Sequence, residues 1–275
     1  MAGVSVALTI AGSDSSAGAG VQADLKTFAA FAVYGVTAIT AVTAQNTKGV
    51  SAIRELDPSM VEAQIDAVVD DIGVDAVKTG MLCNAGIIEK VAERLRAHRL
   101  ERLVVDPVIA AKDGTLLLRD DAVEVLRRLL LPLALVVTPN ASEAEVLTGH
   151  PVRNVREARA AARAIAAMGP RYVVVKGGHF GEDATDVLYD GTDFTELSAQ
   201  RIATTSTHGT GCTFSSAISA CLARGQSVIQ SVRQAKEYVH QSMIAAFPLG
   251  EGHGPLHHFH RWWTIPLKKY DRREN

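Results

Sequence analysis

The chain contains 275 residues, 47% of them hydrophobic and 21% charged, and carries a formal net charge of -2. This composition is typical of a globular protein with a sizeable core, and it excludes a strongly basic surface for nucleic acid. The three cysteines, Cys83, Cys212 and Cys221, are odd in number and show no C-x-x-C spacing, so neither a disulfide framework nor a zinc site is indicated. The opening residues lack a basic segment before their apolar run, and we expect a strand there, in a cytoplasmic protein.

The first predicted unit is a strand, a glycine loop and a helix. The β-rich run 4–10 leads into the small-residue segment 11–20, and an apolar stripe from Val21 through Phe28 to Ala32 then predicts a helix. The glycines lack the spacing of a dinucleotide-binding fingerprint, and the segment lacks the Gly-Lys-Ser/Thr of a P-loop. The loop is therefore either a flexible connection or a place where a small ligand approaches the backbone.

Strands and helices then alternate along the chain. Strands are predicted at 36–43, 75–78, 103–108, 133–138 and 172–176, and helices at 58–72, 87–95, 122–130, from 141 onward, and at 155–168. Pro58 and a Ser59-x-x-Glu62 capping box indicate the start of the first of these helices. Several strands are continuously apolar, which predicts an α/β fold with a mostly parallel sheet covered by helices on both faces. In such sheets ligands bind beyond the carboxyl ends of the strands.

The pattern changes after residue 178. The runs 185–189 and 194–202, separated by Asp190-Gly191, predict a small antiparallel hairpin late in the chain. The sequence shows no internal repeat, low-complexity segment or linker, so a single domain of residues 1–275 is the simplest interpretation.

The segment Thr207-His208-Gly209-Thr210-Gly211-Cys212-Thr213 is the strongest local indication of function. Two glycines around a threonine allow a tight turn whose N–H groups gather in one concavity, and the run 214–223 predicts a helix that begins there, with Gly225 as its C-terminal cap. This turn is typical of a phosphate or oxyanion site. At the positive end of the helix we expect the pKa of Cys212 to fall toward neutrality, which would make the thiol a proton acceptor. A plain tight turn with a buried cysteine is the alternative.

Nine motifs follow one another in a familiar order: Ala7 to Asp14, Gly18 to Lys26, Ala44 to Thr47, Lys78 to Met81, Asp106 to Val108, Thr138 to Asn140, Lys176 to His179, His208 to Thr213 and Gly254 to His260. Together they resemble the ribokinase-like superfamily and, within it, the hydroxymethylpyrimidine and phosphomethylpyrimidine kinases of thiamine biosynthesis. The resemblance covers nearly the whole chain. It implies a ribokinase-like fold, ATP and Mg²⁺, and a homodimer. The implied reaction phosphorylates 4-amino-5-hydroxymethyl-2-methylpyrimidine to its monophosphate and then to the diphosphate.

The same resemblance assigns roles in phosphoryl transfer. The amides of Gly209, Gly211 and Cys212 would stabilise charge on the transferring group, and Cys212 would act as the base. Sugar kinases of the superfamily carry an aspartate there, so the cysteine departs from the broader pattern and matches the pyrimidine kinases. On the ATP side the resemblance points to Thr210 and Lys176; for Lys176, extension into solvent is the alternative.

Gln45 is the expected pyrimidine contact. Its amide presents an acceptor and a donor side by side, which match an exocyclic amino group and the adjacent ring nitrogen, as glutamine matches adenine. A glutamine bonded only to its own loop is the alternative. The resemblance adds Gly12, Ala19 and Met81 as walls of the substrate pocket.

Asn140 and Glu143 resemble the Asn-x-x-Glu element that helps the superfamily hold magnesium through water, and Asp106 is a second metal candidate. The same Asn-x-x-Glu pattern equally predicts a helix N-cap with a favourable first-turn acid. Lys112 lies where the family has a lysine in a mobile flap, but Asp113 follows it in place of the expected serine, which leaves the role of Lys112 open.

The remaining candidates are expected to be structural. His253, His257, His258 and His260 fit the family's C-terminal segment and are not predicted to bind metal, and Cys83 and Cys221 are expected to be buried. Two alternative functions stay open: a pyridoxal/pyridoxine kinase, which shares the fold and the glycine-cysteine loop, and a non-catalytic pyrimidine-binding regulator. No nucleic-acid or membrane partner is expected.

Overall fold

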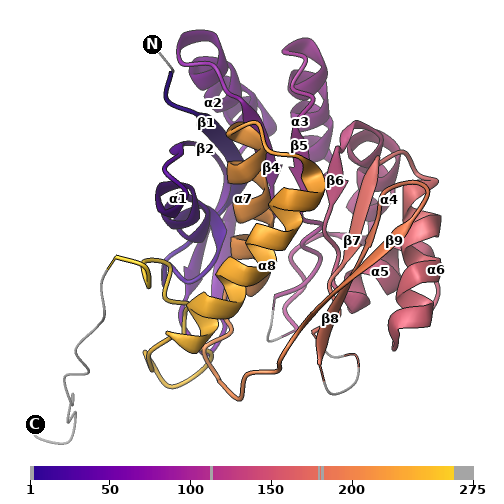
Figure 1. Ribbon diagram of the computed structural model, residues 1–275. Coiled ribbons are helices and arrows are strands. Elements are labelled where there is room, and N and C mark those ends of the chain that lie inside the picture. Colours follow the sequence, from indigo (N-terminus) through magenta and orange to yellow (C-terminus); the bar gives the residue numbers. More distant parts are fainter. Residues whose placement is uncertain (1–2, 112–113, 179, 181–182, 263–275) are drawn as a thin grey trace, which may run out of the picture.

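The computed structural model describes residues 3–262 apart from 112, 113, 179, 181 and 182. Within that part of the chain, nine strands form one sheet in the order β3-β2-β1-β4-β5-β6-β7-β8-β9 (Figure 1). The strands are β1 Val6–Asp14, β2 Tyr34–Gln45, β3 Val50–Glu55, β4 Ala76–Thr79, β5 Leu103–Val105, β6 Val136–Val137, β7 Tyr172–Val175, β8 Ala184–Tyr189 and β9 Phe194–Ala199. The stretch from β2 to β7 is parallel, whereas β3 pairs antiparallel with β2, and β8 with both β7 and β9.

Helices cover both faces of the sheet (Figure 1). One face carries α1 Gly20–Ala30, α7 Thr210–Ala223 and α8 Val228–Ile244, and the other carries α2 Pro58–Asp71, α3 Ala85–Ala97, α4 Asp120–Val125, α5 Ala141–Thr148 and α6 Val155–Ala166. Successive strand residues point to opposite faces. In β5, Val104 therefore joins the core under α7, while Leu103 and Val105 join the other core. Burial on both faces explains why these strands are continuously apolar.

The predicted fold class and the late hairpin are confirmed, with three local corrections. β9 ends at Ala199 and not at residue 202. β6 is only two residues long, because α4 continues through a π-helical turn at Leu126–Leu130 and a 3-10 turn at Leu131–Leu133, where Pro132 cannot donate to a strand ladder. The N-cap of α2 is Asp57, so the predicted Ser59 capping box does not form.

None of the helices in the described part of the chain combines the length and the apolar character needed to cross a bilayer.

Candidate active site

Two loops from opposite ends of the chain pack against each other beyond the carboxyl end of β1. Gly209 caps α7 in the left-handed conformation, with φ of 79°. A Cβ at Gly209 would overlap the carbonyl oxygen of Gly18, and a Cβ at Gly18 would overlap the ring of His208. The glycines at 18 and 209 therefore allow the backbone of the β1 loop to touch the turn that begins α7.

The turn at Gly209 leaves backbone donors at the start of α7. The Thr210 hydroxyl donates to the Thr207 carbonyl at 2.7 Å, and the Thr213 amide donates to the Gly209 carbonyl at 2.8 Å. Amides in the first turn of a helix have no carbonyl one turn earlier to bond. Gly211 and Cys212 lie in this first turn, so their amides are free of that constraint, and the anion site expected here stays a prediction.

The expected acidity of Cys212 is wrong. The side chain is partly buried, and loss of hydration raises the pKa of the thiol to about 11, although the ammonium of Lys78 pulls the pKa down. The carboxylates of Asp24 and Asp106 add to the rise. In this resting state Cys212 is a thiol at neutral pH, because burial outweighs the dipole of α7.

A buried ion pair, not predicted from the sequence, lies under this end of α7. Lys78 and Asp24 are both fully buried, with Lys78 Nζ 2.8 Å from Asp24 Oδ2. Asp24 also accepts hydrogen bonds from the hydroxyls of Thr9, at 2.6 Å, and Ser216, at 2.5 Å. Burial opposes the charge on Lys78, but the Asp24 carboxylate raises the lysine's pKa. Ser216 is four residues after Cys212 in α7, so their side chains lie on the same face of the helix.

On its other side, the first turn of α7 meets a charged cluster from the ends of β5 and β7 and the first turn of α5. Lys176 Nζ lies 2.8 Å from Asp106 Oδ1 and 4.0 Å from Glu143 Oε2. A Cβ on Gly211 would lie 3.2 Å from Lys176 Nζ, and Ser215 Oγ lies 3.3 Å from Asp106 Oδ2. Lys176 therefore faces the glycine turn and does not extend into solvent.

The capping alternative for the Asn-x-x-Glu element is confirmed. Asn140 Oδ1 accepts the Glu143 amide at 2.9 Å, and Glu143 Oε2 accepts the Asn140 amide at 2.7 Å. Burial raises the pKa of Glu143 to about 7 despite the nearby Lys176, and the Asp106 carboxylate adds to the rise. At Asp106 burial acts in the same direction, but the Lys176 ammonium holds the pKa of this carboxyl below its usual value.

Gln45 lies at the opposite side of the glycine turn, next to His208. Gln45 Nε2 is 3.4 Å from His208 Nε2, which is itself 2.7 Å from Asp14 Oδ2. Burial opposes ionisation of Asp14, but hydrogen bonds from His208 and from the Ser16 hydroxyl lower its pKa to about 2. Sequence reasoning singled out neither Asp14 nor His208 as a contact of Gln45, because the histidine is 163 residues away from Gln45.

Two of the expected pocket walls, Gly12 and Met81, contact each other. A Cβ on Gly12 would lie 3.2 Å from the sulfur of Met81, so the two residues are in contact. Ala19, the N-cap of α1, donates its amide to Asp14 Oδ2 at 2.8 Å. Ala19 is therefore linked through Asp14 and His208 to Gln45, whereas the part that Gly12 and Met81 play in a substrate pocket stays a prediction.

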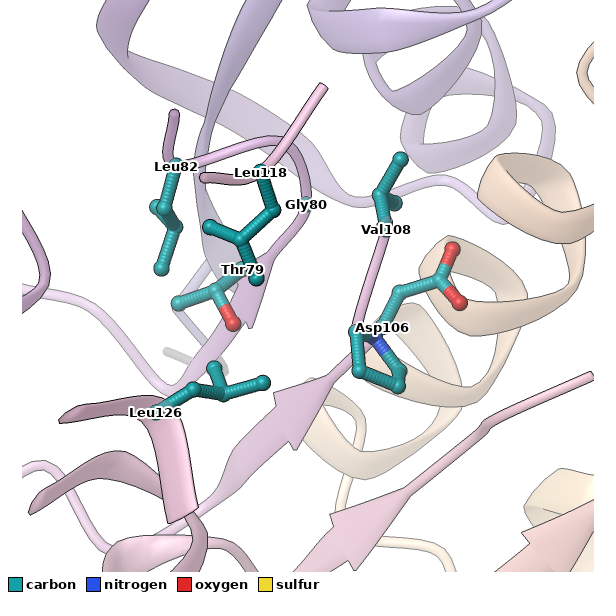
Figure 2. A pocket seen from close by; sticks show the side chains of 8 residues that line it. Thr79, Gly80, Leu82, Asp106, Val108, Leu118 and Leu126 are labelled. Atoms are coloured by element: carbon teal, nitrogen blue, oxygen red, sulfur yellow. The ribbon is translucent and has the colours of Figure 1, made fainter. Parts of the chain in front are cut away.

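A small pocket lies behind Asp106, away from the glycine turn. Figure 2 shows leucines gathered on one side of it, while the Asp106 carboxylate points away from them. The pocket is lined by Thr79, Gly80, Leu82, Asp106, Pro107, Val108, Leu118 and Leu126. Within the described chain Thr79 Oγ1 is buried without a hydrogen-bond partner. Neither Cys212 nor Gln45 lines this pocket, so it does not connect the two sides of the glycine turn.

Several other predicted residues are structural or lie outside the described chain. His257 and His258 are buried, and His258 Nε2 is 3.0 Å from the Thr213 hydroxyl, which ties the C-terminal segment to α7. Cys83 and Cys221 are buried, as expected. Lys112 and Asp113 lie outside the described residues, as does His179. Among residues the structure describes, no three His, Cys, Asp or Glu side chains are grouped to hold a metal.

This arrangement can be set beside known proteins. The chain matches the family model described as phosphomethylpyrimidine kinase over residues 14–257. A hydroxymethylpyrimidine/phosphomethylpyrimidine kinase from Rhizobium meliloti is 51% identical, over 94% of this chain and 98% of its own.

Two solved structures are also similar. A Bacillus subtilis pyridoxal kinase with ADP has a TM-score of 0.86 and 42% identity, covering 93% of this chain and 98% of its own. A Clostridium difficile phosphomethylpyrimidine kinase has a TM-score of 0.77 and 43% identity, covering 86% and 98%. The chain therefore belongs to the phosphomethylpyrimidine kinase family.

Proposed function

We propose that this protein transfers the γ-phosphoryl group of ATP to the hydroxymethyl oxygen of 4-amino-5-hydroxymethyl-2-methylpyrimidine, and then phosphorylates the monophosphate to the diphosphate. One observation supports this function most directly. The first turn of α7 has an amide-recognition end, Gln45 with His208, on one side and a charged end, Lys176 with Asp106, on the other. A pyrimidine and a polyphosphate can thus approach the same anion-binding turn from two sides.

At the pyrimidine end, Gln45 is the binding group. Its amide offers an acceptor and a donor to the 4-amino group and the neighbouring ring nitrogen, an arrangement by which glutamine reads adenine. Gly12, Ala19 and Met81 would line this end and limit the size of the ring that fits.

At the phosphate end, the chain supplies positioning and charge. Phosphoryl transfer passes through a loose transition state, so catalysis comes mainly from holding the groups in line and stabilising negative charge. The amides of Gly211 and Cys212 would donate to the transferring group, with Gly209 shaping the turn and the Thr210 hydroxyl anchoring it. The ammonium of Lys176 would face the nucleotide phosphates.

The two carboxylates beside Lys176 fit a magnesium ion. Mg²⁺ is commonly held by one or two carboxylates together with phosphate oxygens and water. Asp106 and Glu143 supply this donor set, with Asn140 holding Glu143 in place and Lys176 beside both carboxylates. A bound Mg²⁺ would neutralise charge on the phosphates.

Cys212 would accept the proton of the attacking alcohol. Its sulfur must first lose its own proton, and the ammonium of Lys78 is the group that favours this loss. The anion-binding turn therefore provides most of the rate enhancement at neutral pH, and the base contribution grows with the thiolate fraction.

We also propose that the protein acts as a homodimer in the cytoplasm.

Phosphorus NMR and mass spectrometry of the pyrimidine alcohol incubated with enzyme and Mg·ATP test the function. We expect a phosphate ester followed by a diphosphate, with one ADP formed for each phosphoryl group transferred. ATP consumption without a phosphorylated pyrimidine would reject the proposed substrate.

Pyridoxal kinase activity is the second candidate, because the solved pyridoxal kinase with 42% identity has a TM-score of 0.86 to this chain. Competing the two alcohols for one enzyme gives the ratio of their kcat/KM values. We expect this ratio to favour the aminopyrimidine, since pyridoxal lacks the amino group that would pair with Gln45. A ratio that favours pyridoxal would make pyridoxal kinase the preferred function and reject the pyrimidine alcohol as the main substrate.

A further inference from the structure

The contacts of Gln45 raise a question of hydrogen-bond direction. Gln45 Nε2 lies 3.4 Å from His208 Nε2, so two nitrogens face each other. At its other end, Gln45 Oε1 lies 3.1 Å from the hydroxyl of Thr43, and that hydroxyl is also 3.0 Å from the Ser13 carbonyl. A hydroxyl has one proton, so Thr43 can donate to only one of these two oxygens.

The ionisation state of Asp14 determines whether His208 Nε2 donates or accepts a hydrogen bond. Asp14 accepts the amides of Ser16 and Ala19, each at 2.8 Å, as an ionised carboxylate does. An ionised carboxylate only accepts, so the 2.7 Å contact requires a proton on His208 Nε2. That nitrogen then has no lone pair for the amide nitrogen of Gln45.

Turning the amide end for end satisfies every group. Gln45 Oε1 then accepts from His208 Nε2–H, which it shares with Asp14, and Gln45 Nε2 donates to the Thr43 hydroxyl, whose own proton goes to the Ser13 carbonyl. The oxygen and nitrogen of an amide are distinguished by such a network of partners. We propose that the Asp14–His208 pair holds the Gln45 amide with its oxygen toward His208, and that this orientation sets which way round the aminopyrimidine binds.

The orientation of the bound substrate follows from the order of groups on the pyrimidine ring, and this step rests on the proposed function. The 4-amino group pairs with the amide oxygen and the ring nitrogen N3 pairs with the amide nitrogen. The hydroxymethyl group is attached next to the amino group, and the 2-methyl group next to N3. With the amide oxygen toward His208, the hydroxymethyl group lies on the side of Gly209 and the first turn of α7. The opposite amide orientation would direct the hydroxymethyl group toward Thr43. Asp14 and His208 are thus positioning residues that act through Gln45.

NMR of the resting protein tests the orientation without any turnover. The side-chain amide signal of Gln45 is identified by its loss in Gln45→Met. We expect nuclear Overhauser effects from the Gln45 amide protons to the Thr43 methyl group. Effects to the His208 ring in their place would overturn the proposal. With the pyrimidine bound, its 2-methyl group should contact the Thr43 methyl, and contact with the His208 ring would equally overturn it.

Kinetics test the effect on catalysis. In His208→Leu we expect kcat to fall at least twofold with a parallel fall in KM, because half or more of the bound substrate lies the wrong way round. His208→Gln keeps an N–H at about the same reach and should recover kcat. His98→Leu is the matched control, since His98 Nε2 also lies 2.7 Å from an aspartate, Asp66, away from the site. A raised KM with unchanged kcat in His208→Leu would indicate a merely structural histidine and reject the proposal. Absence of pyrimidine phosphorylation in the unmodified enzyme would reject the proposed function, while the NMR result would still report the amide orientation.

Discussion

The Cys212 thiol lies at a helix N-terminus and is partly buried, and these two features act on its pKa in opposite directions. A helix dipole is worth about 0.3–1 kcal/mol, less than one pKa unit, whereas burial can shift a pKa by about 3–5 units. Burial therefore prevails, and the pKa of Cys212 rises to about 11. Below that pH the thiolate is a minor species whose fraction grows about tenfold for each pH unit.

Alkylation by iodoacetamide measures this thiolate directly. Between pH 7 and pH 9 we expect the labelling rate of Cys212, followed by peptide mass spectrometry, to rise about tenfold per pH unit. Cys221 provides the control, because it lies on the same helix but is fully buried and should stay unlabelled in the folded protein. A labelling rate that levels off below pH 8 would show that the helix dipole lowers the pKa after all.

The same titration predicts how Cys212→Ala affects the two phosphorylations. The first nucleophile is an alcohol that must lose a proton, and the second is a phosphate oxygen that is already ionised. Base assistance is worth at most about 10²–10⁴ in rate. We expect the loss in the first step to be greater at pH 9 than at pH 7, and the loss in the second step to be smaller and independent of pH. Single-turnover rates for each step measure both losses, and equal losses at every pH would argue against Cys212 as the base.

At the scale of the secondary-structure element, α7 carries a left-handed glycine just outside each end. Gly209 and Gly225 both have φ of 79°, a conformation that glycine adopts without strain and that is strained for a residue with a side chain. They differ in their surroundings. A Cβ on Gly225 would meet nothing within 4 Å, whereas one on Gly209 would overlap the Gly18 carbonyl.

Alanine at these two positions separates strain from crowding. Gly225→Ala should lower the free energy of unfolding by about 1–2 kcal/mol, with activity unchanged. Gly209→Ala carries the same strain and must also push the two loops apart, so we expect a larger loss of stability together with at least about a hundredfold loss of kcat/KM. Urea unfolding and kinase assays on both variants provide the comparison. Equal activity in the two would mean that the contact between the loops does not matter for catalysis.

Elements with a clear local period were predictable, and those defined by distant partners were not. The helix from Gly20 and the strand before it follow from spacing within a few residues. β3 was missed because Val50–Glu55 is an edge strand with mostly exposed side chains, and its reason to be a strand is its pairing with β2. The α7 turn was predicted from its glycines, but the burial that raises the pKa of Cys212 comes from the tertiary structure. Likewise Asp24 reads as a polar residue off the apolar stripe of α1, while its partner Lys78 is 54 residues away.

At the scale of the whole molecule, Asp24, Lys78 and Ser216 connect α1, β4 and α7 on one side of the sheet. Their contacts lie beneath the site, and Lys78 also acts electrostatically on Cys212 and Asp106. A buried ion pair often adds little stability compared with apolar side chains of similar size, yet removing one partner leaves an uncompensated charge at a cost of about 3–5 kcal/mol. The pair is thus important less for its net energy than because Asp24 keeps the ammonium of Lys78 in place under α7.

Replacing the partners separately and together tests this account of the fold. Lys78→Met leaves Asp24 charged and unpaired, so we expect it to lower the free energy of unfolding by about 3–5 kcal/mol. Asp24→Asn with Lys78→Met should restore much of that loss, because the asparagine is neutral and can accept from one of the Thr9 and Ser216 hydroxyls and donate to the other. Lys48→Met, which removes an exposed ion pair with Glu251, is the matched control and should cost less than about 1 kcal/mol.

Urea unfolding of the single and double variants gives the coupling energy. Losses that simply add would mean that the two charges do not depend on each other. If the double variant regains stability but not activity, the ammonium of Lys78 is required for chemistry at α7 independently of its part in holding the sheet and helices together.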